Sequence, residues 1–440
     1  MINSTPLTGS FRVDVNGWHY LNLVGSPSRR GYQHGYYMDK EIKNFINRVN
    51  LWSIHTFGKN WSFFRQCAKE LYESKLPGEY REEMRGIAKG ARSRGTRLDY
   101  IDILALNGFY DTLTYIFYLK SRQVERRPRP IPQGGCSAFI ATGSSTKNRE
   151  IVIAHNEWWA YLTDETANVF THIVPEEGYE LWLQMRPGLI MSAIDFMINS
   201  AGLMVTSTSI TGTTTFNPEG VPWFVRLREA TQYSRQINSW IKTMITENNG
   251  GLSNQYLIGD YKSGQIAQFE LATFNYHLKK KSNGYFTGSN LGCDSEVKKE
   301  TTFNYADKSA SPCARDLRWK QVLNENNGQI DIELAKKLLA DHFDTFRTIE
   351  KPSARTLCGH IELDEGGWPD YEWGPYYPAG TVDAKVTSSS LAKRGASWIK
   401  WGKPCGTDFL VRQYLEQNPQ YQWQSKYLKD LISHPWTLIS

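Results

Sequence analysis

One cysteine in this chain stands where a nucleophile could be generated by cutting the backbone. Cys136 follows Gly134 and Gly135 at the end of an arginine- and proline-rich segment, and a strand-like run begins at the cysteine. Two glycines allow backbone conformations that other residues avoid, as an attack of the thiol on the preceding peptide bond requires. Cleavage between Gly135 and Cys136 would free an α-amino group with an ordinary pKa of about 7.7–8.0, suited to act as general base for its own thiol.

The run after Cys136 predicts a hairpin that brings polar side chains to the thiol. Strands are predicted over residues 136–142 and 150–155, joined by a turn rich in Gly, Ser and Asn, which places Cys136 roughly opposite His155. Directly opposed residues have side chains about 5 Å apart. An acyl-cysteine formed on the thiol would be released by water, with an oxyanion hole nearby. The residues that arrive beside the cysteine are His155, Asn156, Glu157 and Trp158.

A purely structural interpretation fits the same residue types. A cysteine at the start of a strand is often a small buried core residue, and a lone histidine is often a hydrogen-bonded core histidine. From the residues alone, both interpretations of Cys136 and His155 remain open.

The predicted secondary structure is mostly helical before this hairpin and alternates between strands and helices after it. Residues 27–120 show apolar positions at helical spacing, and residues 121–135 (SRQVERRPRPIPQGG) predict an exposed irregular loop. Strand-like runs flanked by helices favour a layered arrangement of helices and sheets. Further strands are predicted over 180–185, 203–210, 255–261 and 265–271, and further helices over 223–237, 313–324 and 331–343.

Composition excludes several classes of protein. The 440 residues carry a net charge of +6, from 51 basic and 45 acidic residues, which is too even for a dedicated nucleic-acid binder. The longest apolar stretch, residues 188–205, contains Asp195 and Asn199, so no transmembrane helix is expected. The N-terminus lacks the basic start and apolar run of a secretory signal.

The cysteines do not suggest a metal or redox protein. All six (Cys67, Cys136, Cys293, Cys313, Cys358 and Cys405) are widely scattered without a C-x-x-C pair, so neither a zinc site nor a disulfide scaffold is predicted, and no cofactor is expected. The strand that follows Cys136 disfavours a papain-like protease, whose nucleophile stands at the N-terminus of a helix. No G-x-S-x-G motif is present, as a serine hydrolase would need, and no glycine-rich loop of a nucleotide-binding protein is present.

Several motifs, in order, resemble the phospholipase B-like family. They are the Cys136-Ser-Ala-Phe strand, Ala154-His-Asn-Glu-Trp158, Arg186-Pro-Gly188 through Asp195-Phe196, Asn249-Gly-Gly-Leu-Ser-Asn-Gln255 with Gly259-Asp-Tyr-Lys262, and Val382-Asp-Ala-Lys-Val-Thr387. The segment Arg30-Gly-Tyr-Gln-His-Gly35 is similar to one shared by that family and the penicillin acyltransferase type. The resemblance covers most of the chain from about residue 130 onward.

The resemblance implies an α+β fold, a four-layer αββα sandwich of the N-terminal nucleophile hydrolase type, matured by autocatalytic cleavage before Cys136. Residues 1–135 would form a mostly helical segment ending in the linker, and residues 136–440 the catalytic core with a C-terminal extension. Carried over by motif, Cys136 is the nucleophile and Arg315 holds charge beside it. The remaining implied site residues are His155, Asn156 and Trp158 lining the site, Thr208 and Ser209 facing it, and Asn290 as oxyanion donor.

The implied function is hydrolysis of acyl esters, with phospholipids as the leading substrate class. Transient contact with a membrane surface is compatible with it, and no nucleic-acid partner is expected. Two alternatives stay open: an N-acyl amide hydrolase or acyltransferase on the same fold, and a lipid-binding relative that never matures. Family members are commonly secreted or lysosomal, although no signal peptide is visible here.

Overall fold

The computed structural model describes residues 6–123, 135–368 and 373–440, which form two compact units. Unit 1 contains residues 1–116, 166–201 and 216–251, and unit 2 contains residues 117–165, 202–215 and 252–440. Most of the predicted linker, residues 124–134, lies outside the described residues. Among the helices of the described residues, none combines the length and the hydropathy required of a membrane-spanning segment.

Unit 1 combines helices with a sheet in the order β1-β2-β5-β6-β7. The helical character predicted for residues 27–120 is confirmed, whereas the two strands before residue 27 were not predicted. The strands are β1 (Phe11–Val15), β2 (Trp18–Gly25), β5 (Val169–Pro175), β6 (Leu181–Met185) and β7 (Phe196–Asn199). The helices are α1 (Pro27–Tyr37), α2 (Asp39–Phe57), α3 (Trp61–Cys67), α4 (Gly78–Ser93), α5 (Tyr100–Asn107), α8 (Trp223–Tyr233) and α9 (Ile237–Ile245), and α6 (Phe109–Gln123) continues into unit 2.

The RGYQHG segment lies in helix α1, where it packs against α4. A Cβ on Gly31 or Gly35 would collide with the α4 backbone, so only glycine permits this close approach. Arg30 is buried and pairs with Glu83 at 2.7 Å. Burial lowers the pKa of His34 to about 4, and its neutral Nε2 accepts a hydrogen bond from the Gly188 N–H at 3.0 Å. This motif therefore shapes the packing of unit 1.

Unit 2 contains two groups of strands. One runs in the order β8-β9-β10-β11, and the other in the order β12-β3-β4-β16-β17-β18, with β15 paired to β4. The first group consists of β8 (Leu203–Ser209), β9 (Asn254–Asp260), β10 (Gln265–Leu271) and β11 (Tyr276–Lys281). The second consists of β12 (Gly284–Gly288), β3 (Gly135–Thr142), β4 (Val152–Ala160), β15 (Ala379–Thr381), β16 (Asp383–Ser388), β17 (Ser397–Trp401) and β18 (Thr437–Ile439).

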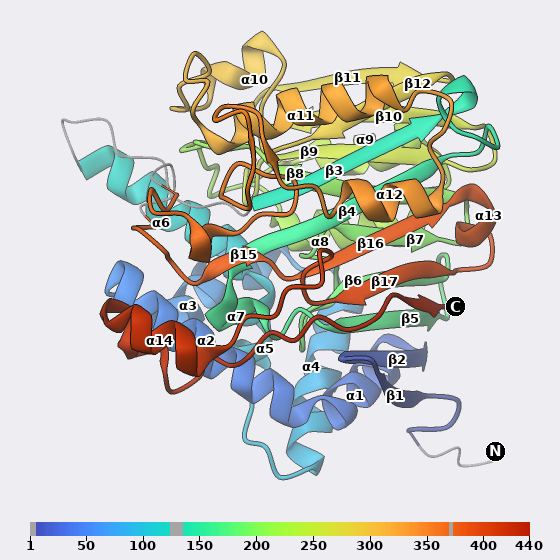
Figure 1. Cartoon of the computed structure of the whole chain (residues 1–440). Helices are drawn as coiled ribbons and strands as arrows, with labels where there is room; N and C mark the ends of the chain where they lie inside the picture. Colours follow the sequence, from blue (N-terminus) through green and yellow to red (C-terminus); the bar gives the residue numbers. More distant parts are fainter. Residues whose placement is uncertain (1–5, 124–134, 369–372) are drawn as a thin grey trace. The chain divides into compact units, whose positions relative to one another are not determined.

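Helices cover one face of the β3-β4-β16 sheet (Figure 1). Phe139, Ala154 and Val386 on that face form one apolar core with Trp319 of α11 (Ser311–Glu325) and Leu338 of α12 (Ile332–Leu338). The smaller helices of the unit are α7 (Tyr161–Asp164), α10 (Ser295–Lys299), α13 (Ser389–Ala392) and α14 (Val411–Gln417).

The strands β8, β9 and β10 pack on the other face of β3 and β12. Side chains fill this space closely, since a Cβ on Gly259 would lie 3.1 Å from Ile140 Cδ1 and 3.2 Å from Ile151 Cδ1. The predicted α+β class is confirmed. The layers within each unit, helix on sheet in unit 1 and sheet on sheet on helix in unit 2, are those of an αββα sandwich.

The register of the β3–β4 hairpin differs from the prediction by two residues. Cys136 lies opposite Glu157, and His155 lies opposite Ala138. The reason is that β4 begins at Val152 rather than at Glu150 and the connection carries a 3-10 turn and Arg149 at a positive φ of 59°. A shift of two residues keeps each side chain on its face, so His155 and Glu157 still lie on the face of the sheet that carries the Cys136 side chain.

Candidate active site

The thiol of Cys136 lies at the start of β3, buried against a carboxylate. Its side chain is only 2% exposed, and Sγ donates a hydrogen bond to Glu157 Oε2 at 3.2 Å. Glu157 stands directly across the antiparallel pair, where cross-strand side chains are close. The carboxylate is therefore positioned to accept the thiol proton.

Two distant side chains hold the backbone of Cys136. Its N–H donates to Asn290 Oδ1 at 3.0 Å, and its carbonyl oxygen accepts a hydrogen bond from Arg315 Nη1. Arg315 Nη2 also donates to Asn290 Oδ1 at 2.9 Å. Because two donors converge on that oxygen, the orientation of the Asn290 amide is fixed. The backbone of Cys136 is thus held on both sides of its Cα atom, at the N–H of the peptide predicted to be cut and at the carbonyl of the next peptide.

Asn290 follows β12 in the left-handed region, with φ 68°, a conformation that asparagine tolerates better than most residues. Its Nδ2 donates to the carbonyl and hydroxyl oxygens of Ser209 at 2.9 and 3.1 Å, and its N–H donates to Thr208 Oγ1 at 3.3 Å. Thr208 and Ser209, both predicted to face the site, therefore hold Asn290. In the uncut chain, the amide group of Asn290 expected to supply the oxyanion donor is bonded to Ser209.

Trp158 forms an aromatic wall beside Arg315. The guanidinium lies 4.3 Å from the Trp158 ring centroid, a cation–π contact that orients the planar group. Asn156 Oδ1 accepts hydrogen bonds from Trp158 Nε1 and from the Ser137 N–H, each at 3.1 Å. Asn156 thereby fixes both the indole and the strand position next to Cys136.

His155 is near the thiol but is not poised to exchange protons. A ring nitrogen lies within 4.8 Å of Cys136 Sγ and of the Glu157 carboxylate. Complete burial lowers the pKa of His155 well below its ordinary value, and the charge of Lys385 on β16 lowers it further, although the Ser207 backbone partly opposes both. The imidazole is therefore neutral at physiological pH, so an acid role for it is disfavoured.

Gly359 packs directly against the ring of Trp158. A Cβ on Gly359 would overlap three atoms of the Trp158 ring. We expect Gly359→Ala to lower the free energy of unfolding by about 1–3 kcal/mol through overpacking, measured by urea denaturation. Gly374→Ala is the matched control, because its added Cβ would meet only Tyr421 Oη at 3.6 Å. Equal stability of the two variants would contradict the packing described.

Of the predicted residues, Asn290 and Arg315 hold the backbone of Cys136, and His155 lies within 4.8 Å of its thiol. Asn156 and Trp158 instead contact Ser137 and Arg315. Sequence reasoning placed Glu157 beside the cysteine but gave it no role, and the shift in register is what makes it the partner of the thiol. Asp383 of the Val382–Thr387 motif accepts the Glu157 N–H through Oδ1 at 3.2 Å, and this contact supports the backbone of β4.

Layered sheets surround a buried thiol that is bonded to a carboxylate, while an amide and a guanidinium hold the backbone of the same cysteine, and this arrangement is suited to acyl transfer to sulfur. A family model described as Phospholipase B matches residues 19–303, more than half of the chain. The chain belongs to the phospholipase B family, and its class is that of hydrolases.

The sequence identity to individual proteins is low. An "Uncharacterized protein" of Archaeoglobus fulgidus is 25% identical over 434 residues, covering 88% of this chain and 71% of that protein. "Phospholipase B-like protein F" of Dictyostelium discoideum is 29% identical over 139 residues, 30% of this chain and 24% of that protein. Among solved structures, a mutant conjugated bile acid hydrolase from Clostridium perfringens is 10% identical, with a TM-score of 0.34, covering 60% of this chain and 88% of that chain.

Proposed function

We propose that this protein is a cysteine acyl hydrolase that matures by cutting its own chain before Cys136 and then cleaves acyl esters of phospholipids. The observation that carries the proposal is a set of three hydrogen bonds to Cys136. Its thiol is bonded to Glu157, its backbone N–H to Asn290 and its backbone carbonyl to Arg315. Buried backbone groups of any residue need partners, but here two side chains far along the chain supply them, and a carboxylate binds the thiol as well.

Maturation would begin with the transfer of the thiol proton to Glu157. The sulfur attacks the carbonyl carbon of Gly135, the C–N bond to Cys136 breaks, and the nitrogen takes up a proton to become an amine, which leaves a thioester. Water then attacks the thioester, which releases the Gly135 carboxylate and restores the thiol. Asn290 Oδ1, bonded to the Cys136 nitrogen in the uncut chain, would hold that nitrogen as it becomes an amine.

Turnover would use the new amine as general base. With an ordinary pKa of about 7.7–8.0, the α-amino group accepts the thiol proton, and the thiolate attacks the carbonyl carbon of an ester. The alcohol leaves with a proton, the acyl group stays on sulfur, and water releases it as a carboxylate. Because the Cys136 side chain is 2% exposed, a substrate reaches the thiol only after the covering groups have moved or been cut away.

A pocket within unit 2 supports a lipid substrate. It has a volume of about 680 Å³, begins at Leu291 directly after Asn290, and is lined by apolar groups including Leu317 and Phe346. Three lysines (Lys298, Lys308 and Lys320) and one acid, Asp316, which pairs with Lys320 at 2.6 Å, also line it. The lining is therefore net positive, and acyl chains and an anionic headgroup both find matching chemistry there. This pairing favours a phospholipid over an uncharged ester.

We expect Glu157→Gln to slow maturation. The amide keeps the shape of the side chain but cannot accept the thiol proton, so cleavage before Cys136 should be slower by about 10²-fold, the lower range for a general base. The measurement is the rate at which intact chain disappears, followed by mass spectrometry. Cleavage at the rate of the unaltered protein would show that Glu157 does not take the proton.

The function as a whole is tested with purified protein and two substrates. N-terminal sequencing should find a chain beginning at Cys136, and fatty acid should be released from phosphatidylcholine vesicles faster than from an N-acyl amide of the same chain length. An active preparation containing only uncut chain would overturn maturation. Preference for the amide would overturn the ester assignment while leaving the nucleophile in place.

A further inference from the structure

Two histidines and two cysteines, far apart in the sequence, converge at one point in unit 2. They are His342 before the short strand β13 (Phe343–Asp344), Cys358 and His360 in the loop that follows β14 (Ile349–Glu350), and Cys405 after β17. One ligand atom from each residue lies within 4.8 Å of all the others. None of the four belongs to the site around Cys136.

Their spacing is that of a tetrahedral metal site. His360 Nε2 lies 3.2 Å from His342 Nε2 and 3.5 Å from each of the sulfur atoms of Cys358 and Cys405. Zinc bonds of about 2.3 Å to sulfur and about 2.0–2.1 Å to nitrogen would place tetrahedral neighbours about 3.3–3.8 Å apart. The side chains already stand at nearly the separations that a shared cation would impose.

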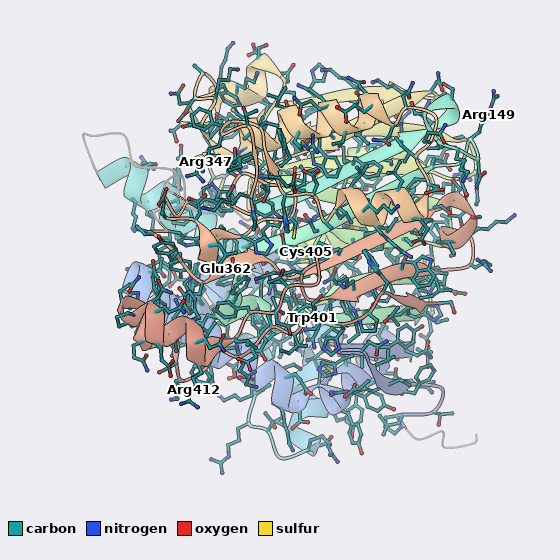
Figure 2. The ribbon with its side chains drawn as sticks, in the orientation of Figure 1. Arg149, Arg347, Glu362, Trp401, Cys405 and Arg412 are labelled. Carbon is teal, nitrogen blue, oxygen red and sulfur yellow. The ribbon has the colours of Figure 1, made fainter. Side chains whose placement is uncertain are left out.

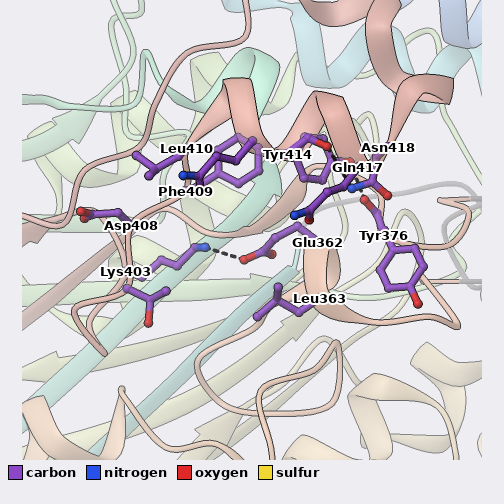
Figure 3. A pocket seen from close by; sticks show the side chains of 12 residues that line it. Glu362, Leu363, Tyr376, Lys403, Asp408, Phe409, Leu410, Tyr414, Gln417 and Asn418 are labelled. Carbon is purple, nitrogen blue, oxygen red and sulfur yellow. Dashed lines mark hydrogen bonds and ion pairs between the residues drawn. The ribbon is translucent and has the colours of Figure 1, made fainter.

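The surrounding groups orient a ligand in the manner of known metal sites. His360 Nδ1 lies 3.0 Å from Glu362 Oε1, which leaves Nε2 facing the cluster as the ligand atom. Tyr161 donates to Glu362 Oε2 at 2.9 Å, and Lys403 pairs with the same carboxylate. Figure 3 shows Lys403 reaching Glu362, where both line a pocket of about 380 Å³.

Solvent can reach the cluster from one side. Cys358 and His360 are buried, whereas His342 and Cys405 are partly exposed. Figure 2 labels Cys405 and Glu362, which lie close together at the loops bordering the β4–β16–β17 sheet. A cation therefore has a path to ligands that are otherwise enclosed.

We propose that His342, Cys358, His360 and Cys405 bind one structural zinc ion. Two thiolates and two imidazoles are the ligand types that zinc takes in structural sites, and four protein ligands leave no open position for a substrate. The ion links three separate loops. Its role is to fix a fold, independently of whether Cys136 is the nucleophile.

The cluster lies next to residues that contact the site around Cys136. The loop carrying Cys358 also accepts a hydrogen bond from Asn156 Nδ2 at the Leu357 carbonyl, at 3.0 Å, and packs Gly359 against the Trp158 ring. Asn156 and Trp158 belong to β4, beside the nucleophile. Binding of zinc therefore makes the loop of residues 357–359, which contacts Asn156 and Trp158, more rigid.

The pattern escaped sequence reasoning because of its spacing. Zinc motifs are recognised by pairs of ligands two to four residues apart within one loop. Here Cys358 and His360 are separated by one residue, and the other ligands come from residues 342 and 405. The expectation that the chain holds no metal site relied on the missing C-x-x-C pair, and the geometry points the other way.

The test measures metal in the full-length protein. Protein purified without chelators should contain one zinc per chain by elemental mass spectrometry. After removal of zinc, added Co²⁺ should produce a thiolate-to-cobalt charge-transfer band and the intense visible bands of tetrahedral cobalt. This spectrum needs no substitution, so it stands even if a variant fails to fold.

Variants then assign the ligands. Cys405→Ser and His342→Gln should each weaken zinc binding by at least about 100-fold, measured in competition with a chromogenic chelator. Substituting a residue that only hydrogen-bonds to a metal ligand already lowers metal affinity by about 10–100-fold. Cys67→Ala is the matched control, since Cys67 is a free cysteine in α3 of unit 1, and it should bind zinc unchanged. Cys136→Ala should also retain zinc, which separates this proposal from the proposed function.

Three results would overturn the proposal. The first is protein that neither carries zinc nor gives a tetrahedral cobalt spectrum. The second is a disulfide between Cys358 and Cys405 in protein isolated without oxygen, found by mapping peptides. The third is unaltered zinc affinity in both the Cys405→Ser and His342→Gln variants.

Discussion

Replacing Cys136 with alanine is expected to lower ester hydrolysis by at least about 10⁴-fold, as the loss of a catalytic nucleophile does. The same change should leave a single uncut chain, because the sulfur that attacks the Gly135 carbonyl is gone. Release of fatty acid from vesicles and mass spectrometry of the purified protein measure the two effects together. Their joint loss follows from one atom performing both steps.

A second cysteine separates this effect from general damage. Cys67 is buried like Cys136 but lies in α3 of unit 1, so Cys67→Ala should keep both cleavage and turnover within a few-fold of the unaltered protein. Cys136→Ser preserves the shape of the side chain with a weaker nucleophile, and thermal unfolding should show an intact fold. Full turnover by Cys136→Ala would remove this site from the mechanism.

Arg315→Lys is expected to lower turnover by about 10²-fold, which is the typical result of a small displacement of reacting groups. The guanidinium bonds the Cys136 carbonyl with one nitrogen and Asn290 Oδ1 with another, while its plane lies over Trp158. A lysine ammonium has no planar fork and cannot make these contacts together. Steady-state kinetics should show the loss mainly in kcat, because Arg315 positions the nucleophile.

Arg318 provides the control on the same helix. It pairs with Asp341 through Nε at 3.0 Å and Nη2 at 2.6 Å, away from the thiol. Arg318→Lys should therefore leave kcat within a few-fold, even if the stability falls slightly. Equal losses of kcat in the two variants would mean that α11 contributes only stability.

Local topology explains why the site could be approached from the sequence. A strand, a short turn and a second strand must place Cys136 beside the 155–158 segment, and the structure has them adjacent. The register is set by how the turn is built, which depends on Arg149 adopting a positive φ, and no hydrophobic pattern encodes that. Glu157 rather than His155 therefore lies opposite the thiol.

Contacts over long sequence distances could be named only through family motifs. Asn290 and Arg315 are an asparagine after a strand and an arginine on a helix, residue types that fit many surfaces, yet both are completely buried here. The cluster at His342 and Cys405 had no such guide, because its ligands meet only after three loops have packed. Strands β1 and β2 were missed for a similar reason, since a strand depends on its neighbours for pairing and β2 pairs with β5, which is distant in the sequence.

The side chains that grip Cys136 come from far downstream, Asn290 at 154 positions and Arg315 at 179 positions along the chain. A ribosome translates the cysteine long before it reaches either of them. In the proposed maturation, scission depends on both residues, so a nascent or truncated polypeptide would lack the side chains that hold the bond to be cut. The proposed scission would therefore occur only in a chain that has been translated at least as far as Arg315.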